Sequence, residues 1–400
     1  MKGISSAVDV DVGLFYPILL CDQEIFLQHR RIRRSLTDDQ LLAFTDQALN
    51  AFADIEMIMV ARETIDLDAD QCHKALVELA CWGSRTYRGL FDQDAREILR
   101  VYMPDTAPNQ PRRRPTFISE EVPFPWELLY DGEHYQDGDP NMFWGLRMAP
   151  ARVLDKDRDN FIKHVREQTL PSDMLFCLHH RLREAHDTEW PEIEKIVRTT
   201  AEDQFCLLRE SASFPIEGEL KVKDGETLLR YIDGSTHNMV HFACHCRQLA
   251  AGNDALEVSL IAHDVVDNPR LITLETYNFT DTDGGAFFRR PLVFLNACQA
   301  AGGPDSLRKV FNLPRKFVER GAGAVVATVC PIPDYFAAAF ARQFYRLFLG
   351  HPGMRIGEAL RMTRWHFLQQ HNNPLGLAYG LYSPAHYRVA EAPAAMEETL

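Results

Sequence analysis

Hydrophobic and polar residues in the first part of the chain predict one strand followed by helices. The stretch Val8 to Leu20 mixes β-branched and aromatic residues with alternating acids, which is typical of a strand. After the start signal Ser35-Leu36-Thr37-Asp38, apolar residues recur at helical spacing from Leu41 to Met59. A second amphipathic stretch covers residues 70–99. We therefore expect a mainly helical N-terminal portion.

The middle of the chain is predicted to be a loop followed by a small β extension. Residues 104–115 hold four prolines and three arginines without periodicity, which indicates a surface loop or linker at a soft boundary. Beyond it we predict short strands at 116–122, 143–148 and 151–154, with a turn at 138–140.

From Met174 onward, short apolar strands alternate with helical stretches. Strands are predicted at 174–178, 205–208, 239–243, 292–295 and 324–328. Helices are predicted at 190–200, 225–232, 305–320, 334–349 and 354–370. Alternation of this kind indicates an α/β fold in which helices cover both faces of a sheet.

Composition limits the class of protein. The chain has 400 residues, 46% of them hydrophobic, which is enough for one large or two ordinary domains. Its longest apolar runs, such as Ala324 to Val329, are far shorter than the roughly 20 residues that span a bilayer, so no membrane helix is expected. Near the N-terminus, one Lys is followed by residues 8–12, which Asp9 and Asp11 interrupt, and this does not resemble the apolar region of a secretory signal. We expect a cytoplasmic protein.

Charge and cysteine usage exclude further classes. The net charge of -14 argues against nucleic acid as the main ligand, because phosphate binding requires a positive surface. The two dense basic runs, His29 to Arg34 and Arg112 to Arg114, are interpreted as solvated loop or helix-end charges. Nine cysteines without regular spacing predict free thiols, most of them buried, and no disulfide framework.

Two predicted strands lead directly into reactive residues. Met239 to Cys244 is followed by His245, and Leu292 to Ala297 is followed by Cys298. Reactive groups gather at the carboxyl ends of strands in open α/β sheets, so neighbouring parallel strands would bring these two residues to one crevice. An adjacent imidazole makes a thiol a competent nucleophile near neutral pH.

The residues after each strand suggest an oxyanion site. Cys298 leads into the mostly small residues 299–303, and such a tight exit frees a backbone N–H for a developing oxyanion. The N–H of Cys246, which follows His245, is the candidate second donor. Spacing alone does not exclude the alternative that Cys298 is a buried core cysteine and His245 a capping histidine.

Rival chemistries fit the same residues less well. His241, Cys244, His245 and Cys246 suggest zinc, but strand alternation sends His241 and Cys244 to opposite faces, so we expect no metal. Ser211 and Ser213 lack the elbow motif of a serine hydrolase. Three other histidines, His29, His179 and His180, are interpreted as surface or strand-end residues.

Several ordered motifs resemble one family. His-Phe-Ala-Cys-His at 241–245 and Leu-Asn-Ala-Cys-Gln at 295–299 resemble the His and Cys motifs of the CHAT domain, the bacterial branch of the caspase and separase peptidases. Further similar segments lie at 125–131, at 145–147 with Arg152, at 321–328 and at 357–360, so that the resemblance spans roughly 70–387. It implies a caspase-like, mostly parallel sheet flanked by helices.

The resemblance also implies roles for individual residues. His245 would be the general base or ion-pair partner and Cys298 the acylating nucleophile, with the backbone N–H groups of Cys246 and Cys298 as oxyanion donors. The family usually has glycine after the histidine, and Cys246 departs from this pattern. Asn296, two residues before the nucleophile, and Asp334 are candidates for the pocket that binds the side chain before the cleaved bond. Asp334 resembles the acidic position that gives separase-like relatives their preference for Arg or Lys. The alternative role for Asp334 is that of a helix N-cap.

The expected organisation has three parts. Residues 1–110 form an N-terminal strand and helical region that is regulatory or partly integral to the fold, 111–390 the CHAT peptidase domain, and 391–400 a tail. The resemblance implies a protein substrate, a regulatory or activating protein partner, and a role in bacterial defence or programmed cell death. No cofactor, nucleic acid or membrane partner is expected. The alternative function is a non-catalytic interaction or scaffold module with the same fold.

Overall fold

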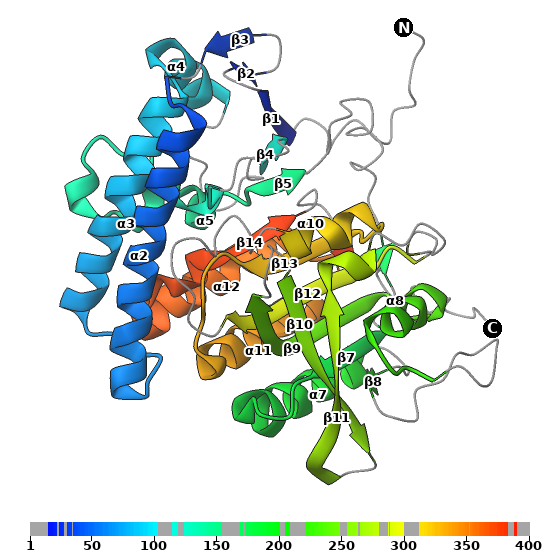
Figure 1. Cartoon of the computed structure of the whole chain (residues 1–400). Coiled ribbons are helices and arrows are strands. Elements are labelled where there is room, and N and C mark those ends of the chain that lie inside the picture. The colour runs from blue at the N-terminus through cyan, green and yellow to red at the C-terminus, as the bar shows by residue number, and fades with distance from the viewer. Residues whose placement is uncertain are drawn as a thin grey trace, which may run out of the picture.

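The computed structural model describes most of the chain. The described residues are 15–21, 24–27, 30–33, 35–102, 114–118, 124–153, 169–170, 173–200, 205–208, 221–248, 254–262, 265–279, 287, 289–299, 312–351, 353–382 and 388–389. Within these ranges, one large sheet holds 13 strands, with helices on both faces (Figure 1). A further pair of short strands, β6 (Thr169–Leu170) and β15 (Arg388–Val389), lies apart from it.

The N-terminal portion is helical, as expected, and it also supplies one edge of the sheet. Strands β1 (Phe15–Cys21), β2 (Glu24–Leu27) and β3 (Arg30–Arg33) form this antiparallel edge. The basic run His29 to Arg34, which was predicted to lie in a loop or at a helix end, is thus mostly part of the edge strand β3. Residues 8–14 of the predicted first strand lie outside the described residues.

Three helices follow these strands. They are α2 (Asp38–Arg62), α3 (Ala69–Leu90) and α4 (Gln93–Tyr102). The helix α2 begins with a capping box, in which the Thr37 side chain accepts from the Gln40 N–H and the Gln40 side chain accepts from the Thr37 N–H. The predicted stretch 70–99 is two helices, because Asp92 accepts a hydrogen bond from the Ala95 N–H at 2.8 Å and starts α4 anew.

The prediction of a strand at 143–148 is wrong. Residues Trp144–Arg147 form the short helix α5, in which the Met148 N–H donates to the Trp144 carbonyl at 2.8 Å. The Trp144 ring is buried. Its centroid lies 5.8 Å from that of Tyr87 in α3 and 6.2 Å from that of Phe91, the residue after α3. A short apolar run fits a strand or a buried helical turn equally well, and packing against α3 decides between them.

Strands β8, β7, β9, β12 and β13 lie side by side and parallel in the centre of the sheet. Their bounds are Phe205–Leu207, Met174–Leu178, Met239–Gln248, Leu292–Gln299 and Ala324–Thr328. Strand β14 (Tyr379–Tyr382) pairs with β13 antiparallel and with β5 (Ala151–Val153) parallel. Through β5, β4 (Arg114–Ile118) and β1, the sheet runs on into the N-terminal strands.

A hairpin that was not predicted extends the other edge. Strands β10 (Asp254–Ala262) and β11 (Val265–Glu275) are antiparallel, and β10 pairs with the last part of β9. Strand β7 pairs with the first part of β9 along the same edge. The two neighbours of β9 on this side therefore follow one another end to end.

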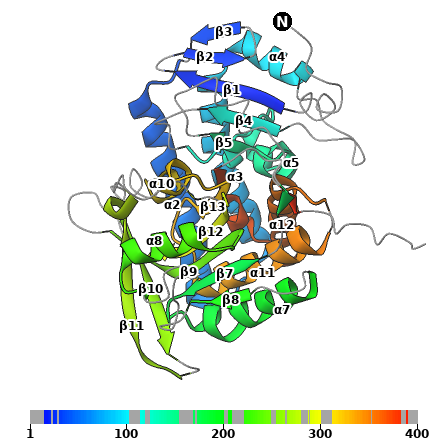
Figure 2. The ribbon, with the colours of Figure 1, turned by 90° about the vertical axis from the view of Figure 1, so that its right-hand side faces the viewer.

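Helices cover both faces of the central strands, which confirms the α/β fold class (Figure 2). On one face lie α7 (Trp190–Thr200), α11 (Asp334–Gly350) and α12 (Ile356–His371). On the other lie α8 (Gly225–Gly234) and α10 (Asn312–Glu319). No helix in the described ranges is long and apolar enough to cross a membrane.

A buried ion-pair cluster joins the middle segment to the C-terminal elements. The Nη1 and Nη2 groups of Arg152 donate to the Glu127 carboxylate at 2.9 and 2.5 Å, and Arg364 Nη2 lies 3.5 Å from Glu127 Oε1. Arg364 also donates to the carbonyls of Gly145 and Tyr379 at 3.0 and 2.6 Å. Glycine is required at 145, since a Cβ there would lie 2.7 Å from the Glu127 Cβ. Segments resembling the family therefore meet in this cluster.

Candidate active site

The two residues predicted to carry the chemistry lie on adjacent strands at the same level. Strands β9 and β12 are parallel, and their register pairs His245 with Cys298 and Cys244 with Ala297. Neighbouring strands are about 4.8 Å apart, so this register brings the two backbones as close as a sheet allows. The side chain of Cys298 lies outside the described part of the structure, whereas that of His245 is described and half-buried.

The predictions that the two strands end immediately before His245 and Cys298 are both wrong, and β12 runs on to Gln299. Strand β9 continues to Gln248, and β10 pairs with this continuation through Glu257 opposite His245 and Leu256 opposite Cys246. His245 is thus flanked by Cys298 on one side and Glu257 on the other. Sequence reasoning missed the continuation because it did not recognise the hairpin strand that pairs with it.

Cys246 occupies ordinary strand backbone. It pairs in register with Gln299 of β12 and Leu256 of β10. Among the described residues, the non-glycine residues with positive φ are Glu63, Arg290 and Asn372, so the backbone at 246 does not require the glycine that the family usually has there. Whether its N–H binds an oxyanion remains a prediction.

His179 is a site residue whose importance the sequence did not reveal. It follows β7, as a strand-end residue should, but it is buried, and its ring centroid lies 4.5 Å from that of His245 in an edge-to-face arrangement. Its N–H donates to the Ala243 carbonyl at 2.8 Å, which ties it to β9. His180 is half-buried, and its N–H donates to the Ser259 hydroxyl at 2.9 Å. His29 lies outside the described residues.

The environment of His179 favours its neutral form. Burial, together with the nearby imidazoles of His245 and His180, lowers the pKa of His179 to about 4, although Glu257 opposes this. The Arg181 N–H donates to His179 Nδ1 at 3.3 Å, which assigns the ring proton to Nε2. That Nε2 lies 4.0 Å from Glu257 Oε2.

Asn296, a predicted pocket residue, is held in a buried polar network. Its Nδ2 donates to Glu189 Oε1 at 2.6 Å, and its Oδ1 accepts from the Tyr379 hydroxyl at 2.8 Å. The same Glu189 oxygen lies 2.9 Å from His241 Nε2, while His241 Nδ1 lies 3.1 Å from the Tyr345 hydroxyl. All five side chains are buried. The network anchors β12 two residues before the candidate nucleophile.

His241 and Cys244 lie on opposite faces of β9, as strand alternation predicted. The His241 ring stacks on Phe176 and Phe294 at 4.5 and 5.2 Å, whereas Cys244 belongs to the apolar cluster on the other face with Phe242. Among the described residues, no group of three or more histidine, cysteine or acidic side chains is placed to hold a metal ion. The seven cysteines whose side chains are described form no disulfide with one another.

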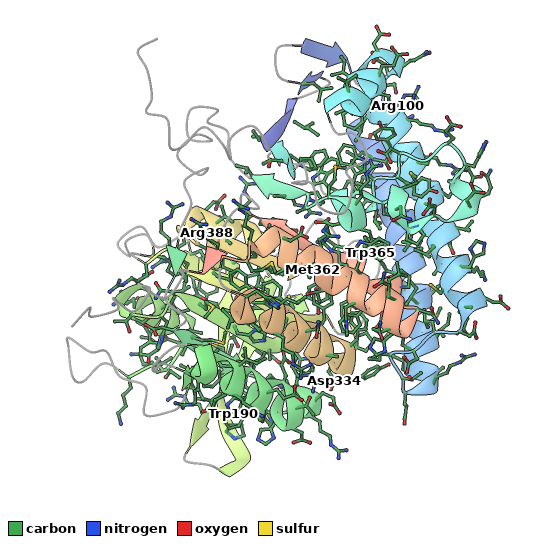
Figure 3. The ribbon with its side chains drawn as sticks, turned by 180° about the vertical axis from the view of Figure 1, so that it is seen from behind. Arg100, Trp190, Asp334, Met362, Trp365 and Arg388 are labelled. Carbon is green, nitrogen blue, oxygen red and sulfur yellow. The ribbon has the colours of Figure 1, made fainter. Side chains whose placement is uncertain are left out.

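Asp334 is the first residue of α11 and not its N-cap. The cap residue is Pro333, and the Asp334 carboxylate accepts from the Tyr335 N–H at 2.8 Å. Figure 3 shows Asp334 at one end of α11 on the back of the molecule. Asp334, Glu56 and Glu63 together act on Tyr335, and burial followed by these three carboxylates raises the pKa of Tyr335 to about 12. Asp334 therefore belongs to an acidic region.

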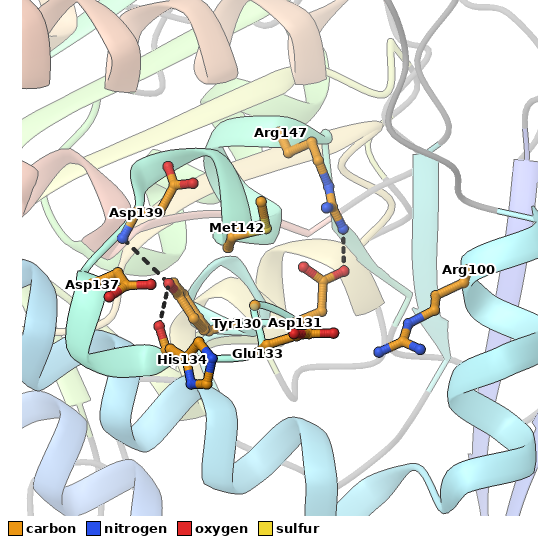
Figure 4. Close-up of a pocket in the computed structure, with 10 residues that line it drawn as sticks. Arg100, Tyr130, Asp131, Glu133, His134, Asp137, Asp139, Met142 and Arg147 are labelled. Carbon is orange, nitrogen blue, oxygen red and sulfur yellow. Dashed lines mark hydrogen bonds and ion pairs between the residues drawn. The ribbon is translucent and has the colours of Figure 1, made fainter.

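A polar cavity of about 420 Å³ lies elsewhere in the molecule (Figure 4). Residues of the segment 130–142, together with Arg100 and Arg147, line it, and no residue of β9 or β12 does. Arg147 forms an ion pair with Asp131 at its wall, and Asp131 also accepts from Trp144 Nε1 at 3.1 Å. This cavity is therefore separate from the His245–Cys298 pair.

Similar folds occur among solved structures. A chain of the Saccharomyces cerevisiae separase–securin complex matches with a TM-score of 0.52 and 10% identity, over 92% of this chain and 30% of that one. This protein thus spans less than a third of the length of that chain. Gingipain R, an Arg specific cysteine proteinase, matches with a TM-score of 0.44 and 8% identity, over 78% of this chain and 75% of that one. The complex of Porphyromonas gingivalis RgpB pro- and mature domains gives 0.45 and 8%, over 79% and 77%.

Sequence comparisons define the family. No curated protein sequence matches the chain significantly. The family model described as the CHAT domain matches residues 185–389, just over half of the chain, and these residues carry β9, β12 and both candidate catalytic positions. The likeness to the separase complex, at 10% identity, concerns the fold alone and agrees with this match. The chain belongs to the CHAT domain family and has a caspase-like fold.

Proposed function

We propose that this protein is a cysteine endopeptidase in which Cys298 is the nucleophile and His245 its base. The observation that carries the proposal is the register of β9 and β12, which pairs these two residues on adjacent parallel strands. An imidazole next to a thiol favours the thiolate, which is the reactive form. Along β12, strand alternation assigns position 298 to the same face as Phe294 and Asn296. Along β9, it assigns position 245 to the same face as His241.

The proposed reaction has two steps. The Cys298 thiolate attacks the scissile carbonyl carbon, and the backbone N–H groups of Cys246 and Cys298 stabilise the oxyanion that forms. The imidazolium of His245 then gives its proton to the leaving amine as the C–N bond breaks and a thioester remains. Water hydrolyses the thioester, with His245 taking a proton from the water and the thiol leaving.

We propose that the substrate is a protein cleaved after a basic residue. Asp334, Glu56 and Glu63, which all act on Tyr335, support this preference, because a group of carboxylates attracts Arg and Lys side chains. Asn296 is the second pocket candidate. The net charge of -14 agrees with a basic recognition segment in the substrate.

We further propose a cytoplasmic role in bacterial defence or programmed cell death, with a regulatory or activating protein as partner. The proposal rests on the family to which the chain belongs. The expected division into residues 1–110, 111–390 and 391–400 is part of it, with the first segment partly integral, since β1 to β3 belong to the same sheet as the central strands.

A thiol-reactive peptidase probe tests the enzyme against the scaffold alternative. We expect labelling of the wild type that is lost in Cys298→Ala and kept in Cys81→Ala, where a half-buried thiol of α3 is removed. Because a partner could be required, the labelling is repeated in cell lysate. No labelling under either condition would favour the non-catalytic scaffold module.

A peptide library with varied residues before the cleaved bond tests specificity. We expect preference for Arg or Lys, and its loss in Asp334→Ala. The control is Asp187→Ala, which removes an exposed carboxylate that pairs with Arg183 and His186. Unchanged preference in Asp334→Ala removes Asp334 from the pocket.

A further inference from the structure

Two charged or polar side chains, Glu257 and His179, lie beside His245. Glu257 is its register partner on β10, and residues directly opposite each other on antiparallel strands project to the same face. His179 contacts both, since its ring lies 4.5 Å from that of His245 and its Nε2 lies 4.0 Å from Glu257 Oε2. The neighbours Leu256 and Val258 are buried in the cluster on the opposite face, which fixes the direction of Glu257.

We propose that Glu257 is the charge partner of His245 and that His179 is the residue that positions the two. The site would then run across three adjacent strands, from Cys298 on β12 through His245 on β9 to Glu257 on β10. This inference rests on the proposed function, because it assigns both residues a part in the Cys298–His245 reaction. Both act through His245 and neither contacts the substrate.

The charges favour this arrangement. Attack by a thiolate requires His245 to hold a proton, and a nearby carboxylate stabilises the imidazolium. The Glu257 side chain is 19% exposed, so solvent screens its charge only in part. A protonated His179 would repel the imidazolium, but its pKa of about 4 keeps it neutral near pH 7. Within the described ranges, the other titratable and charged groups that act on His179 are His180 and Arg181 of its own loop.

The packing holds His179 in one orientation. Its backbone N–H is bonded to Ala243 of β9, and its Nδ1 accepts from the Arg181 N–H. One tautomer is thereby selected, in which the proton is on Nε2, the nitrogen that lies 4.0 Å from Glu257 Oε2. The edge-to-face contact then restricts rotation of the His245 ring.

The experiment is a titration of the His245 imidazole by NMR in the full-length protein labelled at the histidine rings, with the His245 signal assigned from its absence in His245→Gln. We expect Glu257→Gln, which keeps the shape and removes the charge, to lower the pKa of His245 by about 0.5 to 1 unit. The matched control is Glu226→Gln on α8, which removes an exposed carboxylate on the opposite face of the sheet.

Equal pKa values of His245 in the wild type, Glu257→Gln and Glu226→Gln would overturn the proposal. If Glu257→Gln does not fold, Glu257→Asp retains the charge on a shorter side chain and is expected to give a smaller decrease. The titration needs no substrate, so it separates two failures. A lowered pKa without probe labelling of Cys298 refutes the peptidase, whereas labelling with an unchanged pKa refutes the role of Glu257.

Discussion

The amide nitrogen of Asn296 donates to Oε1 of Glu189 at a distance of 2.6 Å. The two residues are 3% and 1% exposed, so the bond forms away from solvent. Asn296 precedes Cys298 by two positions on β12, and Glu189 lies directly before α7. The strand that carries the candidate nucleophile is thereby fixed to the helix layer beneath it.

Asn296→Asp tests whether this residue is structural or lines a pocket. Two buried carboxyls at this distance cannot both ionise, so we expect the free energy of unfolding to fall by about 2–4 kcal/mol at pH 7. One carboxyl would have a folded-state pKa above its unfolded value, so the loss is smaller at pH 5 and grows as pH rises. Urea unfolding at both pH values measures it, with the exposed Asn50→Asp as control. Unchanged stability with stronger selection for Arg or Lys would instead assign Asn296 to the pocket.

The ionisation of Cys298 is expected to depend on His245. Alkylation by iodoacetamide, followed by mass spectrometry of the Cys298 peptide, should have a midpoint at least about one pH unit below the 8.5 of free cysteine. His245→Ala should return the midpoint toward 8.5, because no imidazolium remains to stabilise the thiolate. His73→Ala, an exposed histidine of α3, should leave it unchanged. A midpoint near 8.5 in the wild type would contradict the paired thiolate.

The low pKa of His179 predicts a pH dependence of stability. Its folded-state pKa of about 4 lies below the unfolded value of 6.5, so its contribution is complete above pH 6.5 and is lost as pH falls toward 4. Over this range, the difference in unfolding free energy between the wild type and His179→Phe should decrease by up to about 3 kcal/mol. Urea unfolding at several pH values measures the difference. A constant difference would refute the assignment of a neutral, buried His179.

Glu127→Gln is expected to destabilise the protein by about 3–5 kcal/mol, because it leaves the buried guanidinium groups of Arg152 and Arg364 without their carboxylate. The urea midpoint is the measurement. Glu133→Gln, an exposed residue of the same segment, is the control and should change stability little. An equal, small effect of both substitutions would mean that solvent or other groups compensate the two arginines.

Much of the central sheet could be predicted from the sequence. The periodicity located β7, α7, α8, β13, α11 and α12 to within about three residues, because these elements have strong apolar patterns and clear starts. The meeting of His245 and Cys298 was expected on the condition that their strands are parallel neighbours, and β9 and β12 meet that condition. The alternation of Leu256, Val258 and Leu260 with polar residues was a usable strand signal for β10 that was not recognised.

The remainder depends on contacts between distant segments. The burial of His179 depends on its hydrogen bond to β9 and on its contact with His245, which is 66 positions away, and no local pattern encodes this. The hydrogen bond between Asn296 and Glu189 joins residues that are 107 positions apart in the sequence. The helix α5 depends on the packing of Trp144 against Tyr87 of α3 and on the hydrogen bonds that Arg364 and Trp365 of α12 donate to the carbonyls of Gly145 and Leu146.

The buried ion-pair cluster of Glu127, Arg152 and Arg364 limits how short a fragment of this protein can be and still fold on its own. The segment that defines the family begins at residue 185, yet Arg364 within it has its carboxylate partner at 127, and the sheet continues beyond β14 through β5 and β4. A fragment limited to 185–389 would hold a buried cation without a counter-charge and an uncovered sheet edge. Expressed alone, it should aggregate, so the smallest piece that keeps the site intact must reach back before Glu127.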